Sequence, residues 1–212
     1  MSIKTDNIFW LGHDSFRLCG SRTVYFDPWE VSGPPADLIL ITHDHHDHCD
    51  PETVKLLSGP KSRVFCDPSS AAKLKAAAVI TPIVTMDPGD EMEYLGVVIK
   101  AVPSYNLDKD FHPRRKGNLG FIITLDGVTI YHSGDSDFIP EMESFSAQVA
   151  LLPVSGTYVM TAEEAAEAAL AIKPEVAIPM HYGKIVGDEQ MALRFAEALR
   201  GRIMVEIKPL VP

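Results

Sequence analysis

A short apolar run that ends in a cluster of histidines decides the fold of this chain. Residues 37–41 read DLILI and residues 42–48 read THDHHDH, so four of the eight histidines fall within six positions. The apolar run is typical of a strand that is buried on both faces of a sheet. A buried strand that leads directly into imidazole and carboxylate groups predicts a functional site at its end.

The spacing of these polar residues indicates metal binding. Side chains alternate along an extended backbone, so His43 and His45 point the same way and can share one ion. Asp47 and His48 follow a turn, because the Asp-Pro pair at residues 50–51 is typical of a helix start. Because these residues provide two neighbouring positions, we expect two divalent ions. Imidazole and carboxylate ligands suit zinc first, with manganese or iron as alternatives. A solvated histidine-rich tract is the alternative, but the strand and helix signals on either side argue against it.

The cluster and four further segments resemble the metallo-β-lactamase-fold hydrolases. The matching segments are residues 10–13 (WLGH), 26–29 (FDPW), 132–135 (HSGD) and 179–183 (PMHYG). Within that family the chain is most similar to a small single-domain branch that includes ascorbate-6-phosphate lactonase-like proteins. The resemblance implies an α+β fold, a four-layer αββα sandwich of two mixed β-sheets, with residues 1–212 forming a single hydrolase domain.

The resemblance also implies a ligand set in which Asp135 bridges both ions and His181 completes the second one. The third imidazole of the first ion is a departure, because the corresponding position holds Asn106, whose carbonyl is a weaker ligand. His112, in the loop that follows, is the alternative for this position. The predicted metal ligands are therefore His43, His45, Asp47, His48, Asp135, His181 and Asn106.

Two residues are candidates for proton transfer. His13 lies in a turn, where a surface role and an active-site role are about equally expected, and in the site it could donate a proton to a leaving group. Asp47 could hold the proton of the attacking hydroxide or orient it. Asp27 is either an acceptor for the N–H of a ligand histidine or a turn residue. For Cys49, beside His48, a buried thiol is expected more than a thiolate ligand.

The charge of the chain limits its partners. With 19 Lys and Arg against 29 Asp and Glu, the net charge is -10, which argues against nucleic acid as a partner. No apolar run approaches the roughly 18 residues of a membrane span, and the N-terminus has no signal-peptide pattern, so we expect a cytoplasmic protein without a membrane partner. Three widely spaced cysteines fit a reducing compartment. A homo-oligomer is left open.

One loop is rich in basic residues, although the chain as a whole is acidic. Residues 107–118 contain Lys109, Arg114, Arg115 and Lys116. Beside a metal site these residues would favour a small anionic substrate, because arginine and lysine bind phosphate and carboxylate groups. The alternative is a solvated loop whose charges keep it exposed.

Together these features predict a metal-dependent hydrolase. A hydroxide held by the ions would attack an ester, lactone or phosphodiester bond in a small, anionic substrate. The alternative is a redox or non-catalytic metal-binding protein on the same fold. The non-catalytic alternative is retained because Asn106 stands where the family has a histidine ligand. Fold-level analogy ends at the reaction class, so the substrate and the resident metal stay open.

The rest of the chain predicts alternating strands and helices. The expected helices are residues 50–57, 67–78, 161–172 and 188–200. The expected strands are residues 3–11, 16–26, 37–41, 63–65, 81–85, 91–102, 119–125, 128–131, 149–153, 176–178 and 203–207.

Overall fold

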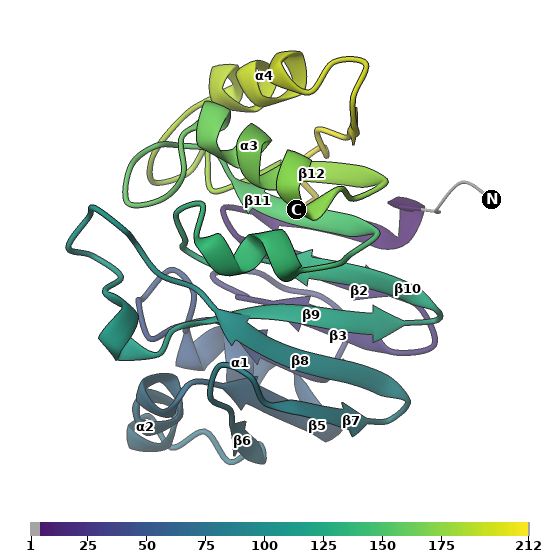
Figure 1. Ribbon diagram of the computed structural model, residues 1–212. Helices are drawn as coiled ribbons and strands as arrows, with labels where there is room; N and C mark the ends of the chain where they lie inside the picture. Colours follow the sequence, from purple (N-terminus) through teal and green to yellow (C-terminus); the bar gives the residue numbers. More distant parts are fainter. Residues whose placement is uncertain (1–4, 212) are drawn as a thin grey trace.

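Two mixed β-sheets pack face to face in the computed structural model, which describes residues 5–211 (Figure 1). The first sheet has the order β1-β2-β3-β4-β5-β6, and the second has the order β13-β12-β11-β10-β9-β8-β7. The first comprises β1 (Ile8–Gly12), β2 (Ser15–Cys19), β3 (Thr23–Phe26), β4 (Ala36–Ile41), β5 (Ser58–Cys66) and β6 (Ile83–Thr85). The second comprises β7 (Glu91–Tyr94), β8 (Val97–Pro103), β9 (Leu119–Leu125), β10 (Val128–His132), β11 (Val149–Pro153), β12 (Val176–Met180) and β13 (Met204–Val205).

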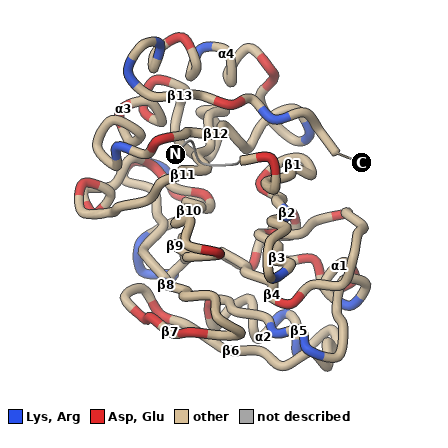
Figure 2. The backbone as a smooth tube through the Cα atoms, turned by 90° about the vertical axis from the view of Figure 1, so that its right-hand side faces the viewer, with Lys and Arg blue, Asp and Glu red and all other residues tan. Residues whose placement is uncertain are grey.

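Four α-helices form the outer layers. Figure 2 shows the layers edge-on, with α1 outside the first sheet and α3 outside the second. The helices are α1 (Pro51–Leu57), α2 (Pro68–Ala76), α3 (Ala162–Ile172) and α4 (Glu189–Ala198), and three short 3-10 helices span Thr5–Asn7, Arg114–Lys116 and Pro140–Ser144. The predicted four-layer αββα architecture is therefore confirmed. Within residues 5–211, no helix has the length and apolar character that crossing a membrane requires.

Strand β4 holds the layers together as its sequence predicts. Leu38 and Leu40 are fully buried in the core between the two sheets, whereas Ile39 and Ile41 are fully buried in a second cluster with side chains of α1 and α2. Full burial of one such side chain contributes about 1.5–3 kcal/mol. The strand is thus fixed from both faces, and the histidine cluster begins where this packing ends.

The helix starts are fixed by the caps that the sequence indicates. The carboxylate of Asp50 accepts a hydrogen bond from the backbone N–H of Glu52, and Asp67 caps α2 in the same way. Thr161 and Glu164 form a reciprocal capping box at the start of α3. The cap at Asp50 matters for the site, because it ends the loop that carries His48.

Two predicted strands are wrong in one respect, because each is divided by a turn. The segment expected as one strand over residues 16–26 is β2 and β3, joined by a turn in which the N–H of Gly20 bonds to the carbonyl of Arg22. The segment over residues 91–102 is β7 and β8, separated at Leu95 and Gly96, which both have positive φ. The terminal strand is limited to Met204–Val205. Residues 3 and 4 lie outside the described part of the chain.

Candidate metal centre

Loops from both sheets bring two groups of metal-ligand side chains together. In each group, the candidate donor atoms all lie within 4.8 Å of one another. The first group is His43, His45, His112 and Asp135, and the second is His13, Asp14, His48 and His181. These residues follow β4, β10 and β12 or lie in the β1–β2 turn and the β8–β9 loop. The prediction that strand ends converge on one rim is confirmed in its geometry.

The first group is rich in imidazole. His112 Nε2 lies 3.2 Å from His45 Nδ1 and 3.3 Å from Asp135 Oδ2, and His43 Nε2 lies 3.9 Å from that same oxygen. A donor binds zinc at about 2.0–2.1 Å, so two donors that share an ion lie at most about 4.2 Å apart. All of these separations fit one shared ion.

The third imidazole of this group is His112, which corrects the expectation that Asn106 fills the position. The amide nitrogen of Asn106 donates hydrogen bonds to Asp137 and to the carbonyl of Tyr158, and its oxygen accepts one from the backbone N–H of His112. The same oxygen lies 3.1 Å from Nδ1 of the His112 ring. Because an amide oxygen can only accept, Nδ1 carries the proton and Nε2 is left to face the other donors. Asn106 therefore orients a candidate ligand.

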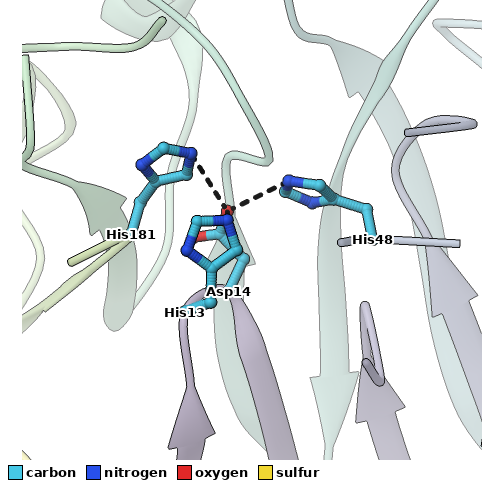
Figure 3. A group of neighbouring side chains, drawn as sticks. All are labelled: His13, Asp14, His48 and His181. Atoms are coloured by element: carbon cyan, nitrogen blue, oxygen red, sulfur yellow. Dashed lines mark ion pairs between the residues drawn. The ribbon is translucent and has the colours of Figure 1, made fainter. Parts of the chain in front are cut away.

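The second group adds carboxylate to imidazole. His48 Nε2 and His181 Nε2 each lie 3.4 Å from Asp135 Oδ1, whereas the first group faces Asp135 Oδ2. Figure 3 shows the rings of His48 and His181 on either side of Asp14, whose Oδ2 lies 3.5 Å and 4.0 Å from their Nε2 atoms. The two oxygens of Asp135 thus face different groups, as a bridging carboxylate requires.

Buried hydrogen bonds hold these rings in place. Asp27 accepts from Nδ1 of His48 at 2.8 Å and from the hydroxyl of Thr42 at 2.6 Å. Because the single O–H of Thr42 is used in this way, Nδ1 of His43, at 3.0 Å, is the donor to the Thr42 oxygen. Ser155 Oγ lies 2.9 Å from Nδ1 of His181. In each ring Nε2 is therefore the free nitrogen, and Asp27 has the orienting role that the sequence offered as one alternative.

The backbone is strained where these residues meet. His13, Asp27 and His181 have φ of 52°, 40° and 60°, a conformation that non-glycine residues seldom adopt. Gly134 has φ of +59°, and a Cβ there would lie 2.9 Å from Thr42 Cβ. Strain of this kind costs about 1–3 kcal/mol per residue and concentrates at functional sites. Glycine at 134 allows the loop that carries Asp135 to approach β4, as its place in the sequence suggests.

The electrostatic character of the two groups differs. Burial lowers the pKa of His112 to about 4 and that of His43 well below its ordinary value, so both rings are neutral at physiological pH. Burial also opposes the charge on His181, but Asp135 and Asp14 outweigh it and raise its pKa to about 9. The pKa of His48 is raised for the same reason, by Asp135 and Asp27. The neutral rings of the first group can therefore bind a cation directly, whereas His48 and His181 must each release a proton before they bind one.

His13 and Asp47 form a pair at the edge of the second group. His13 is fully buried, and its Nε2 lies 3.1 Å from Asp47 Oδ2, so it lies within the site and not on the surface. Asp47 Oδ2 is 3.8 Å from His48 Nε2, but Asp47 belongs to neither donor group. The two predicted proton-transfer residues therefore contact each other, with Asp47 on the more exposed side.

Several buried polar atoms at the centre show that the residues fit bound cations. Within residues 5–211, His43 Nε2, His48 Nε2, Asp135 Oδ1 and both oxygens of Asp14 are buried without a hydrogen-bond partner. An unsatisfied buried polar group costs about 1–3 kcal/mol, and more when it is charged. Bound divalent ions would satisfy these buried nitrogen and oxygen atoms, because each of the atoms could serve as a ligand.

The comparisons with known proteins agree with this centre. A family model for the beta-lactamase superfamily domain matches residues 7–181. The chain belongs to this superfamily. A UPF0173 metal-dependent hydrolase from Thermoplasma acidophilum is 36% identical over 189 residues, covering 82% of each chain. One from Pyrococcus abyssi is 36% identical over 209 residues, covering 85% of this chain and 92% of that protein.

A solved structure supports the same assignment. The crystal structure of a candidate metal-dependent hydrolase from Parabacteroides distasonis has a TM-score of 0.84 and 31% identity, covering 96% of this chain and 93% of that one. The predicted superfamily, its fold and the class of metal-dependent hydrolase are therefore confirmed. The particular bond that a beta-lactamase superfamily protein of this kind cleaves is a separate question.

A pocket opens onto the first group. Its volume is about 310 Å³, and its lining consists of His45, His46, Asp47, Phe111, His112, Asp135, Tyr158 and Ile185. Phe111 and Tyr158 pack edge-to-face with ring centroids 4.4 Å apart, and both are partly exposed. The pocket wall is thus apolar on one side and carries metal-ligand side chains on the other. A small ligand can reach the first group from solvent through this opening.

Some site residues escaped the sequence analysis. Asp14 had no signal of its own beyond its place beside His13, and Thr42 had none beyond its place before His43. Cys49, in contrast, behaves as expected, because it is fully buried and burial raises its pKa to about 12. Tyr182 stacks on Trp10 with ring centroids 4.7 Å apart, which is a packing role.

Proposed function

We propose that this protein hydrolyses an ester, lactone or phosphodiester bond in a small, anionic substrate, with zinc, or else manganese or iron, in the two donor groups. The observation that carries the proposal is Asp135, whose Oδ2 lies 3.3 Å from His112 while its Oδ1 lies 3.4 Å from His48. Ions bound on its two sides supply Lewis acidity and activate a water for attack near neutral pH. Everything else in the reaction falls to the chain's own residues.

Asp47 is the group that orients the attacking water. Burial acts to raise the pKa of Asp47, but the hydrogen bond from His13 and the charge of His48 hold it below the ordinary value. The carboxylate is therefore charged at neutral pH and faces the pocket, where it can accept a hydrogen bond from a water. Burial lowers the pKa of His13 to about 4, so its neutral ring donates to Asp47 and positions it.

The pocket supports a small substrate with both an anionic and an apolar part. Lys109 pairs with Asp137 at 2.6 Å and Arg114 with Glu141 at 2.8 Å, so two members of the basic loop are committed to ion pairs. Lys116 is close enough to His45 to lower the pKa of that ring, after burial. Lys116 is therefore a basic residue near the first group that can attract an anion, while the apolar wall of the pocket takes the rest of the substrate.

The surface charge favours a small molecule over nucleic acid. Figure 2 shows Lys and Arg spread over α4, α2, β5 and the C-terminal segment, with acidic residues between them. Nucleic-acid binding relies on clustered basic residues that release counterions from the phosphate backbone. With a net charge of -10, the chain offers little for such binding. Its three cysteines fit a reducing compartment, and we place the protein in the cytoplasm.

The test is a hydrolysis screen with protein loaded with zinc or manganese. Generic nitrophenyl esters, lactones and phosphodiesters are supplied, and turnover of at least one class is expected. Asp47→Ala and His181→Ala should abolish that turnover while leaving the circular dichroism spectrum unchanged. Asp44→Ala is the matched control, because Asp44 lies in the same histidine cluster but neither in a donor group nor in the lining of the pocket. Full activity of both site variants, or no turnover by metal-loaded wild type, would refute the proposal.

A further inference from the structure

Asp14 is a fully buried carboxyl group at the centre of the second donor group. It lies in the turn between β1 and β2, with no exposed surface. Within residues 5–211, neither of its oxygens has a hydrogen-bond partner. Burying a carboxyl group without a hydrogen bond is costly, and a cation shared with the rings that face Asp14 would offset that cost.

The groups that face Asp14 are ring nitrogens of three histidines, of which only His13 Nε2 is already hydrogen-bonded, to Asp47. Its Oδ2 lies 3.5 Å from His48 Nε2 and 4.0 Å from the Nε2 atoms of His13 and His181 (Figure 3). The opposite nitrogens of His48 and His181 are held by Asp27 and Ser155. These Nε2 atoms therefore cannot turn away, and the space between them and Asp14 has the width that one shared ion requires.

We propose that Asp14 is a direct ligand of the second ion, a position that the histidine cluster had suggested for Asp47. The inference rests on the two-ion site of the proposed function. Because His13 Nε2 is bonded to Asp47, the second ion would have two carboxylates, Asp14 and Asp135, beside the imidazoles of His48 and His181, whereas the first ion would have three imidazoles and one carboxylate. Carboxylates suit manganese and imidazoles suit zinc, so the two positions differ in metal preference. Asp47, hydrogen-bonded to His13, is then free to act on the attacking water.

The test measures metal content, not turnover. Metal-free wild type and three isosteric variants, Asp14→Asn, Asp47→Asn and Asp67→Asn, are titrated with manganese and zinc and assayed for bound metal by mass spectrometry. Asp67 is the matched control, because it is equally buried but caps α2, where asparagine is also a good cap. Wild type, Asp47→Asn and Asp67→Asn should bind two ions per chain.

Asp14→Asn should keep one ion and lose affinity for the other by at least about 100-fold, more than the 10–100-fold typical of residues that only orient a ligand. Two ions bound to Asp14→Asn with wild-type affinity would overturn the inference, and so would loss of an ion from Asp47→Asn in its place. Neither result depends on catalysis. A wild-type protein that binds two ions but cleaves no substrate would defeat the proposed function and leave this inference intact.

A second measurement covers the case in which Asp14→Asn does not fold. Crystals of the wild-type protein grown with manganese locate each ion by anomalous scattering. An Asp14 oxygen at about 2.0–2.2 Å from the second ion, the usual distance for a carboxylate ligand, supports the inference. Both Asp14 oxygens more than about 3 Å from that ion overturn it.

Discussion

The two donor groups, which form the two halves of the metal centre, differ in their ligand types and in their burial. The first group presents three imidazoles and one oxygen of Asp135, and it forms part of the wall of an open pocket. All four residues of the second group are buried and none of them lines that pocket, whereas His45 of the first group is half-buried and lines it. Burial opposes the charge on His48 and His181, but nearby carboxylates outweigh it and raise the pKa of both rings, whereas burial lowers the pKa of His13 to about 4. The comparison shows that solvent reaches the first group through the pocket, while carboxylates surround His48 and His181 in the second.

The largest effect is expected from the one residue that the two halves share. Asp135→Ala should remove a ligand from both ions, so we expect a loss of kcat/KM of at least about 10³-fold, together with loss of both ions on dialysis. Metal content and turnover are measured on the same sample. Asp126→Ala, in an exposed hairpin turn, is the control and should behave as wild type. Retention of one ion by Asp135→Ala would show that the halves are more independent than the shared carboxylate implies.

Removal of His112 separates the halves. His112→Ala leaves His43 and His45 without their third imidazole, so the first ion should be lost while the second is retained. The bound metal should therefore fall from two ions to one per chain, and the ion that remains should be the one held by His48 and His181. If His112→Ala kept both ions, His112 would not be a ligand, and the imidazole-rich description of the first group would be wrong.

The sequence predicted most of this centre, because its residues follow recognisable strands. His43 and His48 follow a run whose burial on both faces is visible in its composition, and Asp135 and His181 end two further apolar segments. Parallel strands of one sheet bring their ends to the same rim, which accounts for Asp135 and His181 after β10 and β12; the two sheets then meet at that rim, where β4 adds His43 and His48. The caps at Asp50 and Thr161 were equally clear, since they depend on neighbouring residues only.

The failures concern residues whose partners are distant in the sequence. Nothing local distinguishes Asn106 from His112, because the choice depends on how the loop between β8 and β9 folds back on Asp137 and Tyr158. Asp14 was missed for the same reason, since its neighbours come from residues 48 and 181. The turn at Leu95 also gave no warning, because a non-glycine residue there adopts positive φ.

A smaller effect should come from the residue that orients His112. Asn106→Ala removes the acceptor of Nδ1 of His112 but no donor atom of the first group. Residues in this role typically contribute 10–100-fold to metal affinity, so the first ion should bind about 10–100-fold more weakly and the second should be unaffected. Competition with a chelator measures both constants. An equal loss at both positions would indicate general damage to the loop and would contradict the orienting role.

The smallest effect concerns the pocket, and it tests whether substrate enters over the first group. Phe111 is half exposed and packs on Tyr158 in the wall of the pocket. It belongs to neither donor group. Phe111→Ala should weaken substrate binding by about 0.5–1.5 kcal/mol, which corresponds to a rise in KM of about two- to tenfold. Metal content and kcat should stay near wild-type values, because Phe111 touches neither donor group.

Leu193→Ala is the matched control for Phe111, since Leu193 is a similarly exposed apolar residue on α4, outside this pocket. An unchanged KM in Phe111→Ala, with full metal content, would mean that substrate does not use the apolar wall. The open first group would then be a route for water and ions alone, and the proposed division between an accessible ion and a buried one would lose its functional meaning. A rise in KM confined to Phe111→Ala would instead place the substrate's apolar part beside His112, above the first ion.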